Sequence, residues 1–229
     1  MRDFHYPGRS TTHGRNGMAA TSHPAATLTA IDILRAGGNA IDAAIAAAAV
    51  LAVVEPQATS IGGDCFCLYA PGGNMAEAIA VNGSGKAPAK ASVEFFQNEG
   101  IDHIGLTTAH AVSVPGAIDA WTSILSKFGS MTLDKVLSDA INYAEEGYVV
   151  APRILCDWVD HVDKLLLTES ATEKLLIDGR APKPGEGMKN PWLTDTLRII
   201  AEQGRDGFYT GRVAEDIVDY LNSLGGIHT

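Results

Sequence analysis

Residues 82–86, Asn-Gly-Ser-Gly-Lys, have the composition of a ligand-binding loop. Gly-rich loops that end in Lys can bind phosphate, because backbone N–H groups and an ammonium group converge on the anion. That pattern requires a Gly five residues before the second Gly and a Ser or Thr directly after the Lys. This sequence has Ala80 and Ala87 at those two positions, which argues against nucleotide chemistry. The residues alone therefore indicate a simple turn that follows a strand.

Cysteine and histidine side chains offer no other obvious chemistry. The three cysteines are Cys65, Cys67 and Cys156, and an odd number without a secretion signal favours free thiols. We expect Cys65 and Cys67 to point to opposite faces of one short strand and to pack rather than react. The histidines lack the spacing with Cys or acidic residues that is typical of a metal site. We expect no metal and no cofactor.

The element that must position any site is a helix expected to be buried on every side. Residues 40–54 are apolar except for Asp42, and a helix that is apolar all round belongs in a protein interior. Asn39 is a good N-cap, and Pro56 prevents the helix from continuing. A membrane span needs roughly 20 apolar residues, so this run is too short to cross a bilayer. A helix enclosed in this way predicts a layered body of helices and sheet.

The other predicted elements place strands early and helices late. Strands at 65–69 and 75–81 form a predicted hairpin, and a loop follows at 82–91. Thr132 is a candidate N-cap in the second half. We expect further helices at residues 24–37, 116–128, 132–146, 151–166, 190–203 and 207–224. The chain is thus predicted to be one domain, 1–229, with strands and the buried helix in about 17–91 and mostly helices in about 115–224.

Composition excludes some classes of partner. The net charge is −10, from 27 Asp and Glu against 17 Lys and Arg, and 46% of the residues are hydrophobic. Binding to phosphate backbones requires clustered Lys and Arg, so we expect no nucleic-acid partner. The N-terminal stretch, residues 1–17, is polar and lacks the apolar core of a signal peptide. We expect a cytoplasmic protein with no membrane partner.

Residues 35–69 carry an ordered series of motifs: Gly-Gly-Asn-Ala, Asp-Ala-Ala, Pro, Gly-Gly and Phe-x-Leu. The series resembles the start of the large subunit of the gamma-glutamyltranspeptidase family, "GGNAxDAAxA…PxxxGxGGxxFxL". The matching residues are Gly37, Gly38, Asn39, Ala40, Asp42, Ala43, Ala44, Pro56, Gly62, Gly63, Phe66 and Leu68. The likeness continues at Ala87-Pro88-Ala89, at residues 113–116, at residues 204–214 and at Gly225-Gly226.

This resemblance implies the fold of N-terminal nucleophile hydrolases, an α+β fold built as a four-layer αββα sandwich. It implies a precursor that cuts itself, so that a Thr becomes the first residue of a small subunit. That Thr attacks an amide carbonyl with its own α-amine as base. The small subunit, from the same precursor, would be the partner of this chain. We expect an incomplete sandwich here, with apolar sheet surface exposed or covered by that partner.

By the same resemblance, no catalytic residue lies in this chain. The family's large subunit continues past the Gly-Gly turn, and its nucleophile and oxyanion donors belong to the small subunit. Thr229 lies three residues after that turn and has the wrong context for a nucleophile. We expect the chain to be the N-terminal part of a large subunit.

The position of Ser84 bears on the substrate. True gamma-glutamyl enzymes carry an Arg in a "DFRE" run just before "APA", and that Arg binds the substrate's α-carboxylate. Aligned from Ala87-Pro88-Ala89, the Arg position falls on Ser84. Losing a hydrogen bond to a charged group costs about 1.5–3 kcal/mol, or about one to two factors of ten in binding. The resemblance therefore favours acylase-like and oxamate-amidohydrolase-like members, with Asn82, Gly83 and Ser84 as substrate-binding residues.

Three hypotheses remain open. The chain belongs to an amide hydrolase that acts on a small amide or acyl substrate other than gamma-glutamyl. Alternatively, it belongs to a gamma-glutamyl transferase or glutathione hydrolase that binds the carboxylate with other residues; Lys86 is near but two residues away and on a flexible stem. The third hypothesis is a non-catalytic scaffold that has lost processing.

Overall fold

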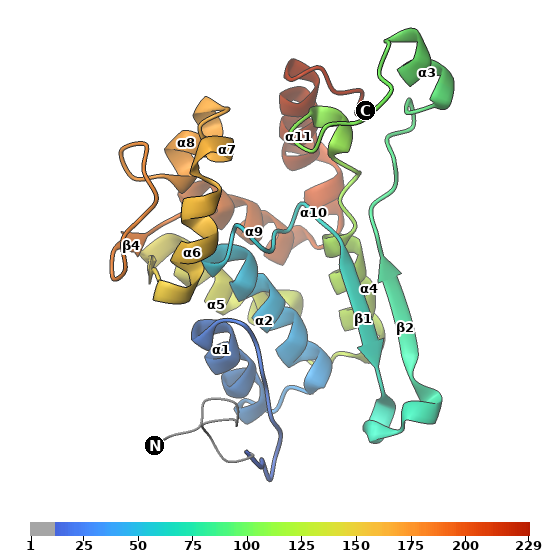
Figure 1. Cartoon of the computed structure of the whole chain (residues 1–229). Helices are drawn as coiled ribbons and strands as arrows, with labels where there is room; N and C mark the ends of the chain where they lie inside the picture. The colour runs from blue at the N-terminus through green and yellow to red at the C-terminus, as the bar shows by residue number, and fades with distance from the viewer. Residues whose placement is uncertain (1–11) are drawn as a thin grey trace, which may run out of the picture.

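The computed structural model describes residues 12–229, so residues 1–11 of the polar N-terminal stretch lie outside it. Helices dominate this range and are accompanied by two antiparallel strand pairs (Figure 1). The helix α2 (Ala40–Val54) packs against α1 (Pro24–Arg35), α4 (Ala117–Phe128) and α5 (Leu133–Glu146). The predicted buried helix is confirmed with its bounds unchanged.

Asp42, the one charge in α2, ties the start of this helix to the turn between α4 and α5. Its side chain is 0% exposed. It accepts hydrogen bonds from Asn39 N at 2.7 Å, Ser130 N at 2.9 Å, Ser130 Oγ at 2.6 Å and Met131 N at 3.1 Å. Burial alone would raise the pKa of Asp42, but the hydrogen bonds from Ser130, Asn39 and Met131 outweigh it and lower the pKa. The carboxylate therefore stays charged in the core.

The predicted hairpin is present, but its second strand begins later than expected. The strand β1 (Cys65–Tyr69) pairs with β2 (Ile79–Gly83), and Phe66 faces Asn82 across the pair. Residues 75–78, expected in the strand, instead enter a 3₁₀ turn in which Asn74 Oδ1 accepts from Ala76 N at 3.1 Å. The strand then continues through residues 82 and 83, so the loop begins two residues later than predicted.

The two faces of this hairpin differ in character. Cys65 and Cys67 are half-buried and face the core, so the expectation that they point to opposite faces is wrong. Residues two apart in a strand share a face, because the side-chain period is two. All three cysteines are free.

The outer face of the hairpin carries Phe66 and Leu68, which are 69% and 77% exposed, whereas α4 covers the inner face (Figure 1). The predicted exposed apolar sheet surface is therefore present.

Most of the second half is helical, as predicted. The helix α5 begins after Thr132, but the Thr132 hydroxyl makes no capping hydrogen bond to the backbone. The helix α9 (Pro191–Gln203) is capped by Asn190, whose Oδ1 accepts from Leu193 N at 3.0 Å, and it packs against α5. Short elements that the sequence pattern does not predict are α3 (Val93–Asn98), α8 (Glu169–Leu175), β3 (Tyr148–Val149) and β4 (Gly187–Met188).

Two of the expected helices are broken. The helix expected at 151–166 is divided into α6 (Pro152–Asp160) and α7 (Val162–Leu165) at His161, whose φ of −111° and ψ of 3° are not helical. No Gly or Pro marks this position in the sequence.

The helix expected at 207–224 is likewise two helices, α10 (Asp206–Tyr209) and α11 (Gly211–Ser223). Here Gly211 has φ +64°, a conformation that residues with a Cβ rarely adopt. Tyr209, the last residue of α10, reaches the start of α4 and contributes to the site described below.

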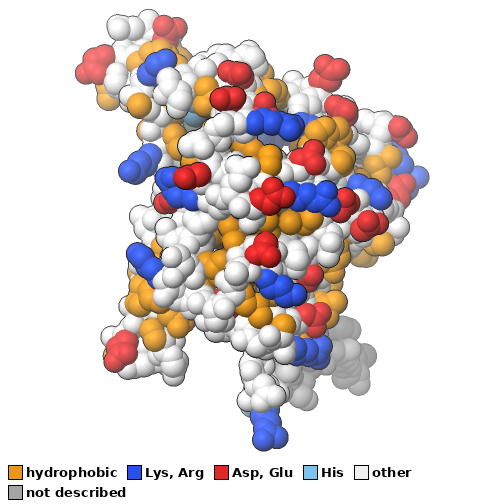
Figure 2. All heavy atoms as spheres, turned by 180° about the vertical axis from the view of Figure 1, so that it is seen from behind, with side chains coloured by type: hydrophobic (Ala, Val, Ile, Leu, Met, Phe, Trp, Pro, Cys, Tyr) orange, Lys and Arg blue, Asp and Glu red, His pale blue; other side chains and the backbone are white. Residues whose placement is uncertain are grey.

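None of the helices within residues 12–229 has both the length and the apolar character needed to cross a bilayer. The same residues contain no cluster of three or more His, Cys, Asp or Glu side chains suited to a metal ion. On the face shown in Figure 2, basic side chains are interspersed with acidic ones.

Candidate substrate-binding site

The predicted substrate-binding residues Asn82, Gly83 and Ser84 lie together where β2 ends. Asn82 is on the outer face of the hairpin, and its Oδ1 accepts a hydrogen bond from Ser84 N at 3.0 Å. This contact closes a short turn of the kind that Asn side chains favour. Asn82 and Ser84 are exposed, whereas Gly83 is half-buried. The turn expected from the residues alone is therefore present, with two polar side chains at its surface.

Hydrogen bonds fix this turn to two other segments. Asp64, which directly precedes β1, accepts from Gly85 N at 2.7 Å through Oδ1. Val114 N donates to the carbonyl oxygen of Lys86 at 2.8 Å. At the start of α4, the N–H groups of Gly116 and Ala117 donate to the carbonyl oxygen of Gly63, at 3.0 and 2.9 Å. The turn, the entry to β1 and the N-terminus of α4 therefore form one connected structure.

Packing explains two of the glycines in this turn. A Cβ placed on Gly83 would lie 2.5 Å from the Cβ of Ala120, and one on Gly85 would lie 2.2 Å from Ser113 Oγ. The space around these glycines is taken by the protein's own α4 and residues 113–116. Contacts within the protein therefore account for both glycines.

A hollow of about 370 Å³ opens beside Ser84. Lys86, Asp119, Arg205 and Tyr209 also line it, and they come from three segments far apart in the sequence. Arg205 Nε donates to the Asp119 carboxylate, and the guanidinium carbon lies 4.7 Å from the centre of the Tyr209 ring. The hydrogen bond to Asp119 raises the pKa of Arg205, and burial raises the pKa of Tyr209. We call this the Ser84 hollow.

Tyr209 anchors that arrangement to the start of α4. Its hydroxyl donates to the carbonyl oxygen of Pro115 at 2.7 Å and accepts from Asp119 N at 3.1 Å. A ring held at its hydroxyl gives a fixed platform on which a guanidinium can stack. Neither Arg205 nor Tyr209 was predicted as a site residue, because each reaches the site only through the tertiary fold. The likeness at residues 204–214 was the one signal that marked this segment.

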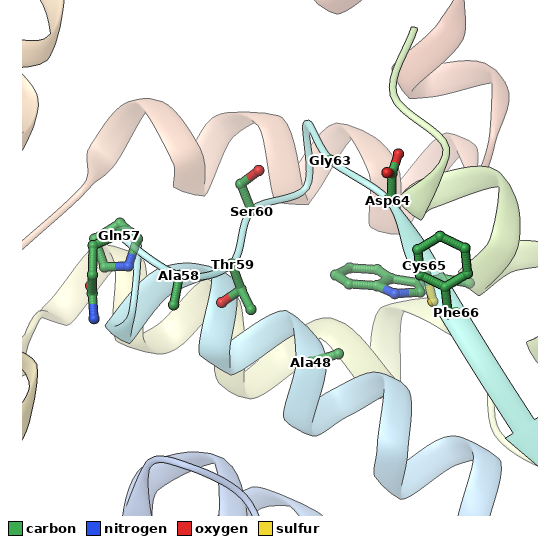
Figure 3. A pocket seen from close by; sticks show the side chains of 11 residues that line it. Ala48, Gln57, Ala58, Thr59, Ser60, Gly63, Asp64, Cys65 and Phe66 are labelled. Atoms are coloured by element: carbon green, nitrogen blue, oxygen red, sulfur yellow. The ribbon is translucent and has the colours of Figure 1, made fainter. Parts of the chain in front are cut away.

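A second hollow, of about 450 Å³, is lined by Asp64 (Figure 3). Thr59 and Ser60 approach it from the loop after α2, and Cys65 and Phe66 from β1, with Ala48 of α2 below. Burial raises the pKa of Cys65, and the neighbouring Cys67 adds to this effect. A thiol with a raised pKa is a poor nucleophile at neutral pH. The polar side chains of this second hollow include Gln57, Thr59, Ser60 and Asp64.

Comparison with known proteins fits this arrangement. The sequence model described as "Gamma-glutamyltranspeptidase" matches residues 26–229. The chain belongs to the gamma-glutamyltranspeptidase family. Among solved structures, a cephalosporin acylase from Bacillus halodurans is 37% identical with a TM-score of 0.90, covering 99% of this chain and 43% of that one. A gamma-glutamyltranspeptidase from Helicobacter pylori is 31% identical with a TM-score of 0.89, covering 96% and 64%. The predicted α+β sandwich, incomplete in this chain, is confirmed.

Curated relatives in the family have different activities. The oxamate amidohydrolase proenzyme of Klebsiella pneumoniae is 35% identical over 94% of this chain and 41% of its own length. The acylase ACY 1 proenzyme of a Pseudomonas strain is 33% identical over 93% and 40%. The glutathione hydrolase-like YwrD proenzyme of Bacillus subtilis is 34% identical over 94% and 41%. The chain thus spans about 40% of the length of these relatives.

Proposed function

We propose that this chain is the N-terminal part of the large subunit of a self-processing amide hydrolase. Its substrate would be a small amide or acyl compound other than gamma-glutamyl. The observation that carries this proposal is Ser84, an exposed residue with one hydroxyl. The resemblance, aligned from Ala87-Pro88-Ala89, puts it at the position of the family's carboxylate-binding Arg. A hydroxyl lacks both the charge and the fork of a guanidinium, so a gamma-glutamyl α-carboxylate would be held weakly.

The nucleophile of this enzyme would come from a small subunit of the same precursor. A Thr at the new N-terminus would attack the amide carbon, its α-amine would accept the proton, and water would then cleave the acyl-enzyme. The uncovered face of the hairpin supports such a partner, because Phe66 and Leu68 expose an apolar surface there. The family's relatives are proenzymes, which also supports processing. We expect the interface with this small subunit to bury more than about 2,000 Å². We also expect a cytoplasmic location.

The second candidate is glutathione hydrolysis or gamma-glutamyl transfer. It is favoured by relatives named glutathione hydrolase proenzymes, such as those of Bacillus subtilis at 31% and Escherichia coli at 33% identity. In that case another cation would hold the α-carboxylate. The two candidates differ in one measurable quantity, the preference for a gamma-glutamyl amide over a small amide.

The test uses the full-length, processed protein with gamma-glutamyl-p-nitroanilide and oxamate as substrates. We expect turnover of the small amide and a KM for the gamma-glutamyl substrate well above the micromolar range. The substitution Ser84→Arg should lower that KM by about 10- to 100-fold, the value of one charged hydrogen bond. The matched control Ser223→Arg, on an exposed residue at the end of α11, should leave it unchanged. Micromolar affinity in the unmodified protein would overturn the substrate assignment.

A further inference from the structure

Two cationic side chains, Lys86 and Arg205, line the same hollow as Ser84. We propose that Arg205 is a specificity-determining residue that binds a carboxylate of the substrate beside Ser84. The preferred substrates would then be small amides that carry an acid group. This inference deepens the proposed function and rests on it for the identity of the reaction, but its binding step can be measured separately.

Arg205 is held in a fixed orientation. Asp119 accepts from its Nε, the Tyr209 ring lies beneath its guanidinium, and Asp206 approaches Nη1 at 3.8 Å. Within residues 12–229, no group accepts a hydrogen bond from its Nη2. The outer end of the guanidinium therefore retains donors that can meet a carboxylate, and a planar fork matches the two oxygens of that group. Because the side chain is already ordered, little further rotamer entropy is lost on binding.

Ser84 adds to this argument, because it lines the same hollow and its one hydroxyl can donate a hydrogen bond to a ligand there. In this chain the cation would thus come from the residue before α10 instead of from the turn after β2. Because of this shift, we expect the acid group of the substrate to lie at a different place from the α-carboxylate of a gamma-glutamyl compound.

Lys86 is the competing cation at the hollow. Its backbone is fixed by the hydrogen bond from Val114 N, but its ammonium group is exposed on a four-carbon stem. Ordering such a side chain around a ligand costs more rotamer entropy than using one already held in place. Arg205 is therefore the better candidate, and the two can be told apart by substitution.

The experiment compares oxamate with oxamide, its neutral diamide, in the full-length processed protein. For Arg205→Gln we expect KM for oxamate to rise by about 10- to 100-fold, with oxamide changed by less than about twofold. Arg205→Lys keeps the charge but not the fork and should give an intermediate KM. Arg198→Gln, which removes an exposed Arg whose ion pair is with Glu145, is the matched control and should change neither substrate. Equal losses on oxamate and oxamide, or a larger loss of oxamate binding in Lys86→Gln, would overturn the inference.

A second measurement is independent of catalysis. Oxalate has the acid group but no amide, and calorimetry should show that Arg205→Gln weakens its binding by a similar factor. If the unmodified protein hydrolyses neither amide but its oxalate binding depends on Arg205, the proposed reaction fails while the binding role of Arg205 stands. If oxalate binds Arg205→Gln as tightly as the unmodified protein, the binding role fails even where amide hydrolysis is confirmed.

Discussion

Replacing the buried carboxylate of Asp42 by an amide should destabilise the protein more than any exposed acid substitution. Asp42→Asn keeps the shape but leaves one oxygen where two accepted hydrogen bonds from Asn39, Ser130 and Met131. The new NH₂ group must face donors, so about two charged hydrogen bonds are lost. At about 1.5–3 kcal/mol each, the expected loss in unfolding free energy is about 3–6 kcal/mol.

Thermal unfolding of the full-length protein measures this loss. A change of 1 kcal/mol shifts the midpoint by about 2–4 °C at this size, so we expect a fall of more than about 6 °C. Asp32→Asn is the control, because Asp32 is an exposed acid in α1 that forms an ion pair with the exposed Arg35. The folded-state pKa of Asp42 is lowered, so its contribution is present above the unfolded value of 3.8 and is lost as the pH falls through the folded value. A midpoint for Asp42→Asn within 2 °C of the Asp32→Asn midpoint would refute the reasoning (about 1 kcal/mol or less).

Two further predictions concern packing and pH. Gly83→Ala should cost about 1–3 kcal/mol in unfolding free energy, because its Cβ would lie 2.5 Å from α4, whereas the control Gly62→Ala meets nothing closer than 3.8 Å. Equal midpoints for the two variants in thermal unfolding would contradict that packing. Burial lowers the pKa of His23, with partial opposition from Glu55, so stability should be complete above the unfolded value of 6.5 and fall as the pH drops toward the folded value. Unfolding between pH 5 and 7 measures this slope, which His23→Gln should flatten; an unchanged slope would contradict it.

The sequence was sufficient where local chemistry decides the structure. The helix α2 was predicted with its correct bounds because Asn39 caps its start, Pro56 follows its end and everything between is apolar apart from Asp42. The strand β2 was displaced because Asn74 favours a 3₁₀ turn that competes locally with an extended chain. The break at His161 carries no Gly or Pro signal, and periodicity alone joined the two helices.

The site was predictable only in part. Asn82, Gly83 and Ser84 are adjacent in sequence, so a turn placed them together correctly. Arg205 lines the same hollow as Ser84 because α10 packs against α9 and its Tyr209 reaches the start of α4. Contacts between residues so far apart depend on tertiary packing, which spacing within one sequence does not encode.

The central claim is that these residues belong to a self-cleaving precursor whose attacking hydroxyl lies outside residues 1–229. Intact-mass analysis and N-terminal sequencing of the purified full-length protein test it most directly. We expect two chains, the smaller beginning with Thr, and a single uncut, inactive chain when that Thr is replaced by Ala. Amide hydrolysis by an uncut precursor, or by residues 1–229 alone, would contradict the claim.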